Sequence, residues 1–185
     1  MPQNALSPDN MQLYNEFIAK LINPFTPLAE LKALYMLPVP MRIGQIKMTI
    51  ERNKSGFARL WPKYSLSLSD GNKFLLSGKK RGANATSNYL ISLDQEKLDK
   101  KSNGYLGKCR SNFLGTEFYI FDTGKNPNKN KGKPVEENRC QHGVVQYETN
   151  VLGSKGPRRM KVFLPNVDAK GNQALWRQST DVSRI

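Results

Sequence analysis

The chain has 185 residues, with 29 lysines and arginines against 15 acidic residues, which gives a formal net charge of +14. A hydrophobic content of 38% is typical of a globular protein with one real core, and excludes a wholly disordered chain. The positive charge favours anionic partners, namely nucleic acid, acidic proteins or an anionic membrane surface. Charge alone does not choose among them, and a solvated basic surface without a specific partner fits it equally well.

Several other classes of protein have little support in the sequence. No segment approaches the roughly 18 consecutive apolar residues of a transmembrane helix, and residues 1–10 lack the features of a secretory signal. Cys109 and Cys140 have no C-x-x-C spacing and His142 is the single histidine, so we expect no metal site and no cofactor. We expect no enzymatic activity, because the sequence has no nucleophile motif and no phosphate-loop or dinucleotide motif.

Residues 1–36 are predicted to form an N-terminal helical segment. Ser7 and Pro8 are typical of a helix start, and Pro24 ends the helical pattern. A short second helix is predicted to begin near Pro27. The apolar residues at helical spacing are Met11, Tyr14, Phe17, Ile18, Leu21 and Ile22. We expect this stripe to pack on the following domain or on a protein partner.

Residues 37–165 are predicted to form the main domain, because from residue 45 the apolar residues recur at every second position. The strand candidates are residues 46–51, 64–68, 73–81, 88–93, 105–111, 116–122, 143–151 and 159–164. About eight short strands with turns between them indicate a mainly β sandwich or barrel. Residues 124–138, rich in Asn, Lys, Gly and Pro, are predicted to be a mobile loop, and residues 166–185 a polar tail without a strand or helix.

Several segments resemble signature segments of the tubby-like family, in the same order and with similar spacing. They are FLLSGKKR (residues 74–81), TSNYLISL (86–93), YLGKCRSNFLGTEF (105–118) and YETNVLGSKGPRRMKVFLP (147–165). Several motifs in order are far more specific than one short pattern. The resemblance spans roughly residues 38–165 and implies a closed antiparallel β-barrel around a central apolar helix.

The family domain continues for roughly another third beyond the point where this sequence stops. We therefore expect a partial barrel of about eight strands, apparently truncated before the last strands and the central helix, with an incomplete edge and interior. The N-terminal helix is the one apolar helix in the sequence that could fill that interior.

The resemblance also implies binding of phosphatidylinositol 4,5-bisphosphate by basic residues two apart on the strand before TSNYLISL. Alternation along a strand places Lys79 and Arg81 on one face and Lys80 on the other. Gly82 and the residues after it interrupt the basic run, so the alignment with the family pair stays open. The pair is either Lys79 with Arg81, or Lys80 with no basic partner at Gly82.

Arg110 matches a basic position of the family, and Lys108 alternates onto the same face. An arginine binds phosphate through a planar fork, and a lysine adds a point charge. Asn88 and Asn112 are candidate hydrogen-bond donors beside them. A charged strand end without a ligand is the alternative interpretation of these basic residues.

From these features we expect an adaptor that is recruited to the cytoplasmic side of the plasma membrane by a phosphoinositide headgroup. Membrane or ciliary trafficking and signalling are the expected setting, and the N-terminal helix is the candidate for binding a protein partner. The alternative is a nucleic-acid-binding or transcription-regulating protein in the nucleus. The strands lack an aromatic stacking stripe, however, and no basic helix is predicted that could enter a groove.

Overall fold

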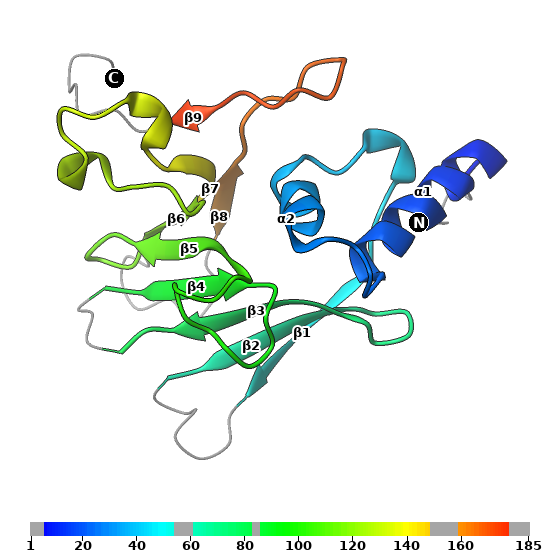
Figure 1. Ribbon diagram of the computed structural model, residues 1–185, viewed down its shortest axis with the longest axis horizontal. Helices are drawn as coiled ribbons and strands as arrows, with labels where there is room; N and C mark the ends of the chain where they lie inside the picture. The colour runs from blue at the N-terminus through cyan, green and yellow to red at the C-terminus, as the bar shows by residue number, and fades with distance from the viewer. Residues whose placement is uncertain (1–5, 54–60, 83–85, 149–158, 178–185) are drawn as a thin grey trace.

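The computed structural model describes residues 6–53, 61–82, 86–148 and 159–177. Within these residues two helices precede one antiparallel sheet (Figure 1). The helices are α1 (Pro8–Ile22) and α2 (Leu28–Met36). The strands are β1 (Met48–Asn53), β2 (Lys63–Leu68), β3 (Phe74–Lys80), β4 (Asn88–Ser92), β5 (Tyr105–Ser111), β6 (Glu117–Phe121), β7 (Cys140–Tyr147), β8 (Met160–Phe163) and β9 (Trp176–Arg177).

Strands β1 to β8 lie in the sheet in chain order, and each is antiparallel to its neighbours. The last strand, β9, pairs with β7 at Cys140 and Gln141, while β8 pairs with the other half of β7. The sheet is not closed, because β1 and β8 lie at its two ends without pairing to each other. The prediction of a mainly β, partial barrel-type sheet of about eight strands behind N-terminal helices is confirmed.

The differences of more than one residue lie at β1, which covers Met48–Asn53 instead of residues 46–51, at β7 and in the tail. Strand β7 begins at Cys140, three residues before the predicted start at Gly143. The predicted structureless tail contains β9, and Val167 bridges to Gln173 ahead of it. A strand of two residues is too short to produce a periodic pattern, so the sequence could not indicate it.

Helix α1 docks on the sheet through one buried leucine. Ser7 caps the helix by accepting a hydrogen bond from the Asn10 amide (3.4 Å), and a proline follows at the first position, as predicted. Leu21 packs against Leu68 of β2 and Leu75 of β3. Both helices lie at one end of the sheet (Figure 1), so α1 is not enclosed by strands in the way that a barrel interior would require. Neither described helix is long and apolar enough to cross a membrane.

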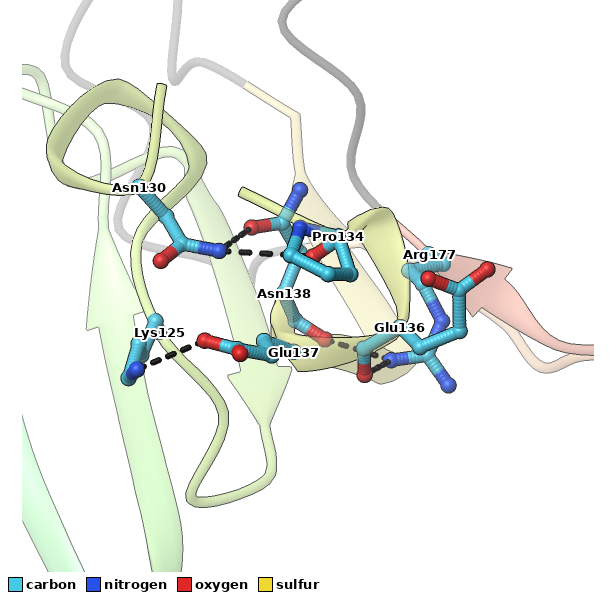
Figure 2. Close-up of polar contacts among 7 residues, drawn as sticks. All are labelled: Lys125, Asn130, Pro134, Glu136, Glu137, Asn138 and Arg177. Atoms are coloured by element: carbon cyan, nitrogen blue, oxygen red, sulfur yellow. Dashed lines mark hydrogen bonds and ion pairs between the residues drawn. The ribbon is translucent and has the colours of Figure 1, made fainter. Parts of the chain in front are cut away.

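Residues 122–139 connect β6 to β7, and we call them the β6–β7 loop. Instead of a mobile segment, the structure shows a loop whose two ends are tied together. The Asp122 carboxylate accepts hydrogen bonds from the amides of Gly124 (2.9 Å) and Cys140 (3.0 Å). Lys125 forms an ion pair with Glu137 across the loop (2.6 Å; Figure 2). The loop therefore starts and ends at the same place on the sheet.

Asparagine side chains hold the middle of the β6–β7 loop. Asn130 and Asn138 are both buried, and the Asn130 amide donates to the side-chain oxygen of Asn138 (2.9 Å; Figure 2). Arg177 of β9 donates to the carbonyl oxygens of Glu136 and Asn138. The Asn-rich composition that predicted mobility thus supplies the hydrogen bonds that order the loop.

Replacing Leu21 with alanine is expected to lower the free energy of unfolding by about 2–5 kcal/mol, because it leaves a cavity between α1 and the β2–β3 end of the sheet. Urea denaturation measures the loss. Met11→Ala is the control, since Met11 lies on the same helix but is 44% exposed. Equal losses for the two variants would show that α1 is not docked through Leu21.

Replacing Arg177 with alanine is expected to loosen the β6–β7 loop, because two loop carbonyls lose their donor. Hydrogen exchange measures this at the Arg139 amide, which donates to the Lys125 carbonyl (2.9 Å). We expect about tenfold faster exchange there, equivalent to about 1.4 kcal/mol of local stability. Lys170→Ala removes the same charge from the same returning segment and should leave exchange in residues 122–139 unchanged.

Candidate functional site

Four of the five predicted basic residues lie on one face of the sheet, across β3, β4 and β5. The first row runs from Lys79 of β3 through Leu90 of β4 to Lys108 of β5, because these residues are direct cross-strand partners. Cross-strand partners in an antiparallel sheet project to the same side. Lys79 and Lys108 therefore share a face two strands apart.

The second row lies two residues along each strand. The Arg81 amide donates to the Asn88 carbonyl (2.8 Å), and Asn88 is the cross-strand partner of Arg110. Alternation puts Arg81 on the side of Lys79, and Arg110 on the side of Lys108. We call this set the basic face: Lys79, Arg81, Lys108 and Arg110.

Lys80 lies on the other side of the sheet. Its cross-strand partner is Tyr89, whose ring packs edge-on against Tyr64 at 6.0 Å between ring centroids. The structure therefore brings Lys79 and Arg81, but not Lys80, together with Arg110. Of the two alignments that the sequence left open, Lys79 with Arg81 is the one that builds a four-cation face.

The basic face combines exposed and partly buried charges. Lys79 and Arg81 are exposed, whereas Lys108 and Arg110 are partly buried. The Nε atom of Arg110 is buried and has no hydrogen-bond acceptor among the described residues. Leaving a buried charged donor without an acceptor costs more than an average hydrogen bond contributes. An anionic oxygen at this position would remove that cost.

Asn112 does not serve the basic face. Its side-chain oxygen accepts from the Thr116 amide (3.0 Å) and its amide donates to the Thr116 hydroxyl (2.9 Å). The side chain of Asn112 thus forms hydrogen bonds within the β5–β6 turn, and its suggested role as a ligand donor stays a prediction. Asn88, the other predicted donor, is buried between Arg81 and Arg110.

A cavity of about 530 Å³ adjoins the basic face between β5 and the β6–β7 loop. None of the described residues that line it carries a carboxylate. We call it the basic cavity, after its six cations: Lys100, Lys108, Arg110, Lys125, Lys129 and Arg139. Four of these six were missed by the sequence reasoning, because they lie in or beside irregular segments where no periodicity assigns a direction to a side chain.

Close backbone packing forms the wall of the basic cavity. A Cβ atom on Gly124 would collide with the backbone of Arg139, so only glycine lets the two ends of the loop approach so closely. The Arg139 guanidinium lies 4.0 Å from the centroid of the Phe121 ring, in a cation–π contact. This contact fixes Arg139 at the edge of the sheet beside the cavity.

The cations of the cavity repel one another. Burial, followed by repulsion from its neighbours, lowers the pKa of Lys108 to about 8. Those neighbours are Arg139, Lys100 and Arg110, and Asp122 acts in the opposite direction. The repulsion from each of the three cations exceeds the opposing effect of Asp122, so the charge around Lys108 is predominantly positive.

Lys100 connects the cavity to the basic face. Burial lowers its pKa, and repulsion from Arg81, Arg110 and Lys129 lowers it further. Arg81 belongs to the basic face and Lys129 to the cavity, so both act on the same ammonium group. The two sites therefore share one continuous region of positive potential.

Cys109 lies between Lys108 and Arg110 in the sequence but alternates onto the opposite side of the sheet. Burial raises the pKa of its thiol, which keeps the thiol protonated near neutral pH. Cys140 is buried, and neither cysteine is in a disulfide. The neighbouring cations therefore do not activate Cys109 as a nucleophile.

Comparison with known proteins relates this geometry to one family. The model of the Tub family matches residues 35–185. Tubby-related protein 2 of Mus musculus is 45% identical over 161 residues, which are 84% of this chain and 28% of the relative. Tubby-related protein 1 of Homo sapiens is 38% identical over 157 residues, covering 84% of this chain and 29% of the relative.

Tubby protein homolog 1 of Caenorhabditis elegans is 42% identical over 129 residues, which are 66% of this chain and 30% of the relative. The chain thus spans about 30% of the length of these curated relatives, and none of their names denotes an enzyme. The family model covers most of the sequence, including every strand of the sheet and both rows of the basic face. This chain belongs to the Tub family.

Proposed function

We propose that this chain binds the phosphorylated headgroup of a phosphoinositide through the basic face and is thereby recruited to a membrane. The observation that carries the proposal is the alignment of Lys79 and Arg81 with Arg110, whose buried Nε has no acceptor among the described residues. Membership of the Tub family supports it, because the family resemblance implies a phosphatidylinositol 4,5-bisphosphate site at these positions. The cytoplasmic side of the plasma membrane, with trafficking as the setting, is part of the same proposal.

The chemistry of the basic face suits a ring that carries neighbouring phosphates. Residues two apart on a strand are separated by about 6.6 Å, and strands two apart by about 9.6 Å. The two arginines offer planar forks that can each bind a phosphate through two hydrogen bonds, and the two lysines add point charges. Because all four side chains stand on paired strands, little conformational entropy is lost when a headgroup binds.

The β5–β6 turn supports a membrane as the source of the headgroup. Phe113 and Leu114 are 83% and 77% exposed in this turn, and Phe113 lies three residues after Arg110. Trp61, 45% exposed, lies against Gly82 at the end of the neighbouring strands. Exposed apolar side chains beside a cationic face match the layered structure of an anionic bilayer surface, with charged headgroups above hydrocarbon.

Replacing Lys79 and Arg81 together with alanine should lower affinity for vesicles containing phosphatidylinositol 4,5-bisphosphate about thirtyfold. This assumes about 1 kcal/mol for each cation at the membrane. Lys131→Ala with Lys133→Ala is the matched control, because these lysines are exposed in the β6–β7 loop and line neither site. Vesicle sedimentation, with phosphatidylserine vesicles of equal charge alongside, measures both.

Equal losses for the two pairs of variants, or equal binding to both kinds of vesicle, would leave only nonspecific attraction between charges. Binding to short duplex DNA tests the alternative function. Tighter binding to the duplex than to the vesicles, with a steep salt dependence, would favour a nucleic-acid-binding protein.

Replacing Phe113 and Leu114 with alanine should weaken vesicle binding at least tenfold, because burying each side chain in lipid contributes about 1.5–3 kcal/mol. Binding to the soluble headgroup, inositol 1,4,5-trisphosphate, should stay unchanged. Phe25→Ala with Leu175→Ala is the control, since both residues are exposed but lie away from the β5–β6 turn. An equal loss in the control would mean that general surface hydrophobicity drives the association.

A further inference from the structure

The basic cavity lies on the side of Arg110 that faces away from Lys79 and Arg81. In the order of the sheet, Lys79 and Arg81 come from β3, whereas the cavity lies between β5 and the loop that leads to β7. Neither Lys79 nor Arg81 lines it. A headgroup bound by Lys79 and Arg81 would therefore not contact most of the cations that line the cavity.

Among the described residues, two acidic groups offset part of the cavity's charge. Asp122 acts on Lys108 and Arg139, and Glu137 acts on Lys125. The Asp122 carboxylate accepts the amides of Gly124 and Cys140, so it is engaged in holding the loop. Glu137 pairs with Lys125 alone (2.6 Å; Figure 2). Lys100, Lys108, Lys129 and Arg110 also line this space of about 530 Å³, which is within the usual range for the site of a small molecule.

We propose that the basic cavity is a second anion site, which binds a ring carrying several neighbouring phosphates. The cavity has several cations on facing walls, from β5 on one side and from the β6–β7 loop on the other, so one compact polyanion can contact both. Lys108 and Arg110 belong to both sites, and the buried Nε of Arg110 supplies a donor. The ring is either a soluble inositol polyphosphate or the headgroup of a lipid that is more highly phosphorylated than the basic face requires.

Glu137 acts as an internal competitor for this site. Its carboxylate holds Lys125 at the wall of the cavity, where a bound phosphate would otherwise contact the same ammonium group. Figure 2 shows the two side chains meeting across the loop. A ligand must therefore displace Glu137 or share Lys125 with it. Glu137→Gln removes the competing charge at nearly constant shape, so it should strengthen the binding of a polyphosphate.

Binding to the cavity should depend on pH through Lys108. The groups that act on its ammonium are Arg139, Lys100, Arg110 and Asp122. A polyanion favours the protonated form, so its affinity should be highest below about pH 8 and should fall as the pH rises through that value. Binding near pH 8 should accordingly be accompanied by proton uptake.

Calorimetric titration of the chain with inositol hexakisphosphate at pH 7 tests the proposal without any lipid. Lys100→Gln with Lys129→Gln should lower the affinity at least tenfold, because both lysines line the cavity, neither belongs to the basic face, and two charge-assisted contacts are lost. Lys131→Gln with Lys133→Gln, the same charge change on the exposed side of the loop, should change it less than threefold. Glu137→Gln should raise the affinity severalfold, and titrations at pH 8 in buffers of different ionisation enthalpy should show proton uptake.

Absence of binding by the unaltered chain, or equal losses for the two lysine pairs, overturns the proposal. The Glu137→Gln variant and the measurement of proton uptake do not depend on whether the lysine variants fold. The proposal is also overturned if Glu137→Gln does not raise the affinity and no proton uptake is detected.

Vesicles with phosphatidylinositol 3,4,5-trisphosphate identify the source of the ring. A loss with Lys100→Gln and Lys129→Gln on these vesicles assigns it to a lipid, and a loss confined to inositol hexakisphosphate assigns it to a soluble molecule. Lys79→Ala with Arg81→Ala tests the basic face separately. This double variant should bind vesicles more weakly, but its affinity for inositol hexakisphosphate should remain largely unchanged.

Discussion

The cross-strand register of β3, β4 and β5 is the constraint on which the site depends. It aligns Lys79 with Lys108 and Arg81 with Arg110, using Leu90 and Asn88 as the residues between them. A slip of one residue in β3 would turn Lys79 and Arg81 to the other side of the sheet and bring Lys80 forward alone. Leu75 of β3 opposes that slip, because the slip would turn this buried side chain to the other side of the sheet.

Electrostatic repulsion between the cations of the basic cavity opposes folding, and interactions in the surrounding structure offset this repulsion. Burial and repulsion lower the pKa of Lys108, which means that its charged form is less stable in the folded chain than in water. The Asp122 hydrogen bonds, the cation–π contact of Arg139 and the buried asparagine pair of the loop offset this repulsion. Unfavourable repulsion at one site, offset by stabilising interactions in the surrounding structure, is typical of sites that bind a charged ligand.

Local alternation explains what the sequence predicted correctly. The strands, the common side of Lys79 and Arg81, and the common side of Lys108 and Arg110 follow from a period of two, which can be recognised within a few residues. The resemblance to the family, and not the alternation, suggested that the two pairs belong together. Lys100, Lys125, Lys129 and Arg139 could not be assigned in this way, because contacts between distant residues place them. The Asn-rich loop was predicted to be mobile for the same reason, since its order depends on Arg177, about forty residues further along the chain. Sequence composition shows which groups can form hydrogen bonds, but not where their partners lie.

The contact of Arg177 with the β6–β7 loop has a thermodynamic consequence. One side chain joins the strand β9 to the loop that carries Lys125 and Lys129, so the pairing of β9 with β7 and the shape of the basic cavity are energetically coupled. Coupling between two equilibria is reciprocal. An anion that stabilises the closed loop must stabilise the attachment of β9 by the same amount, and any molecule that detaches β9 must weaken the affinity for that anion to the same degree. Any interaction that changes the pairing of β9 with β7 would therefore change the affinity of the basic cavity for an anion.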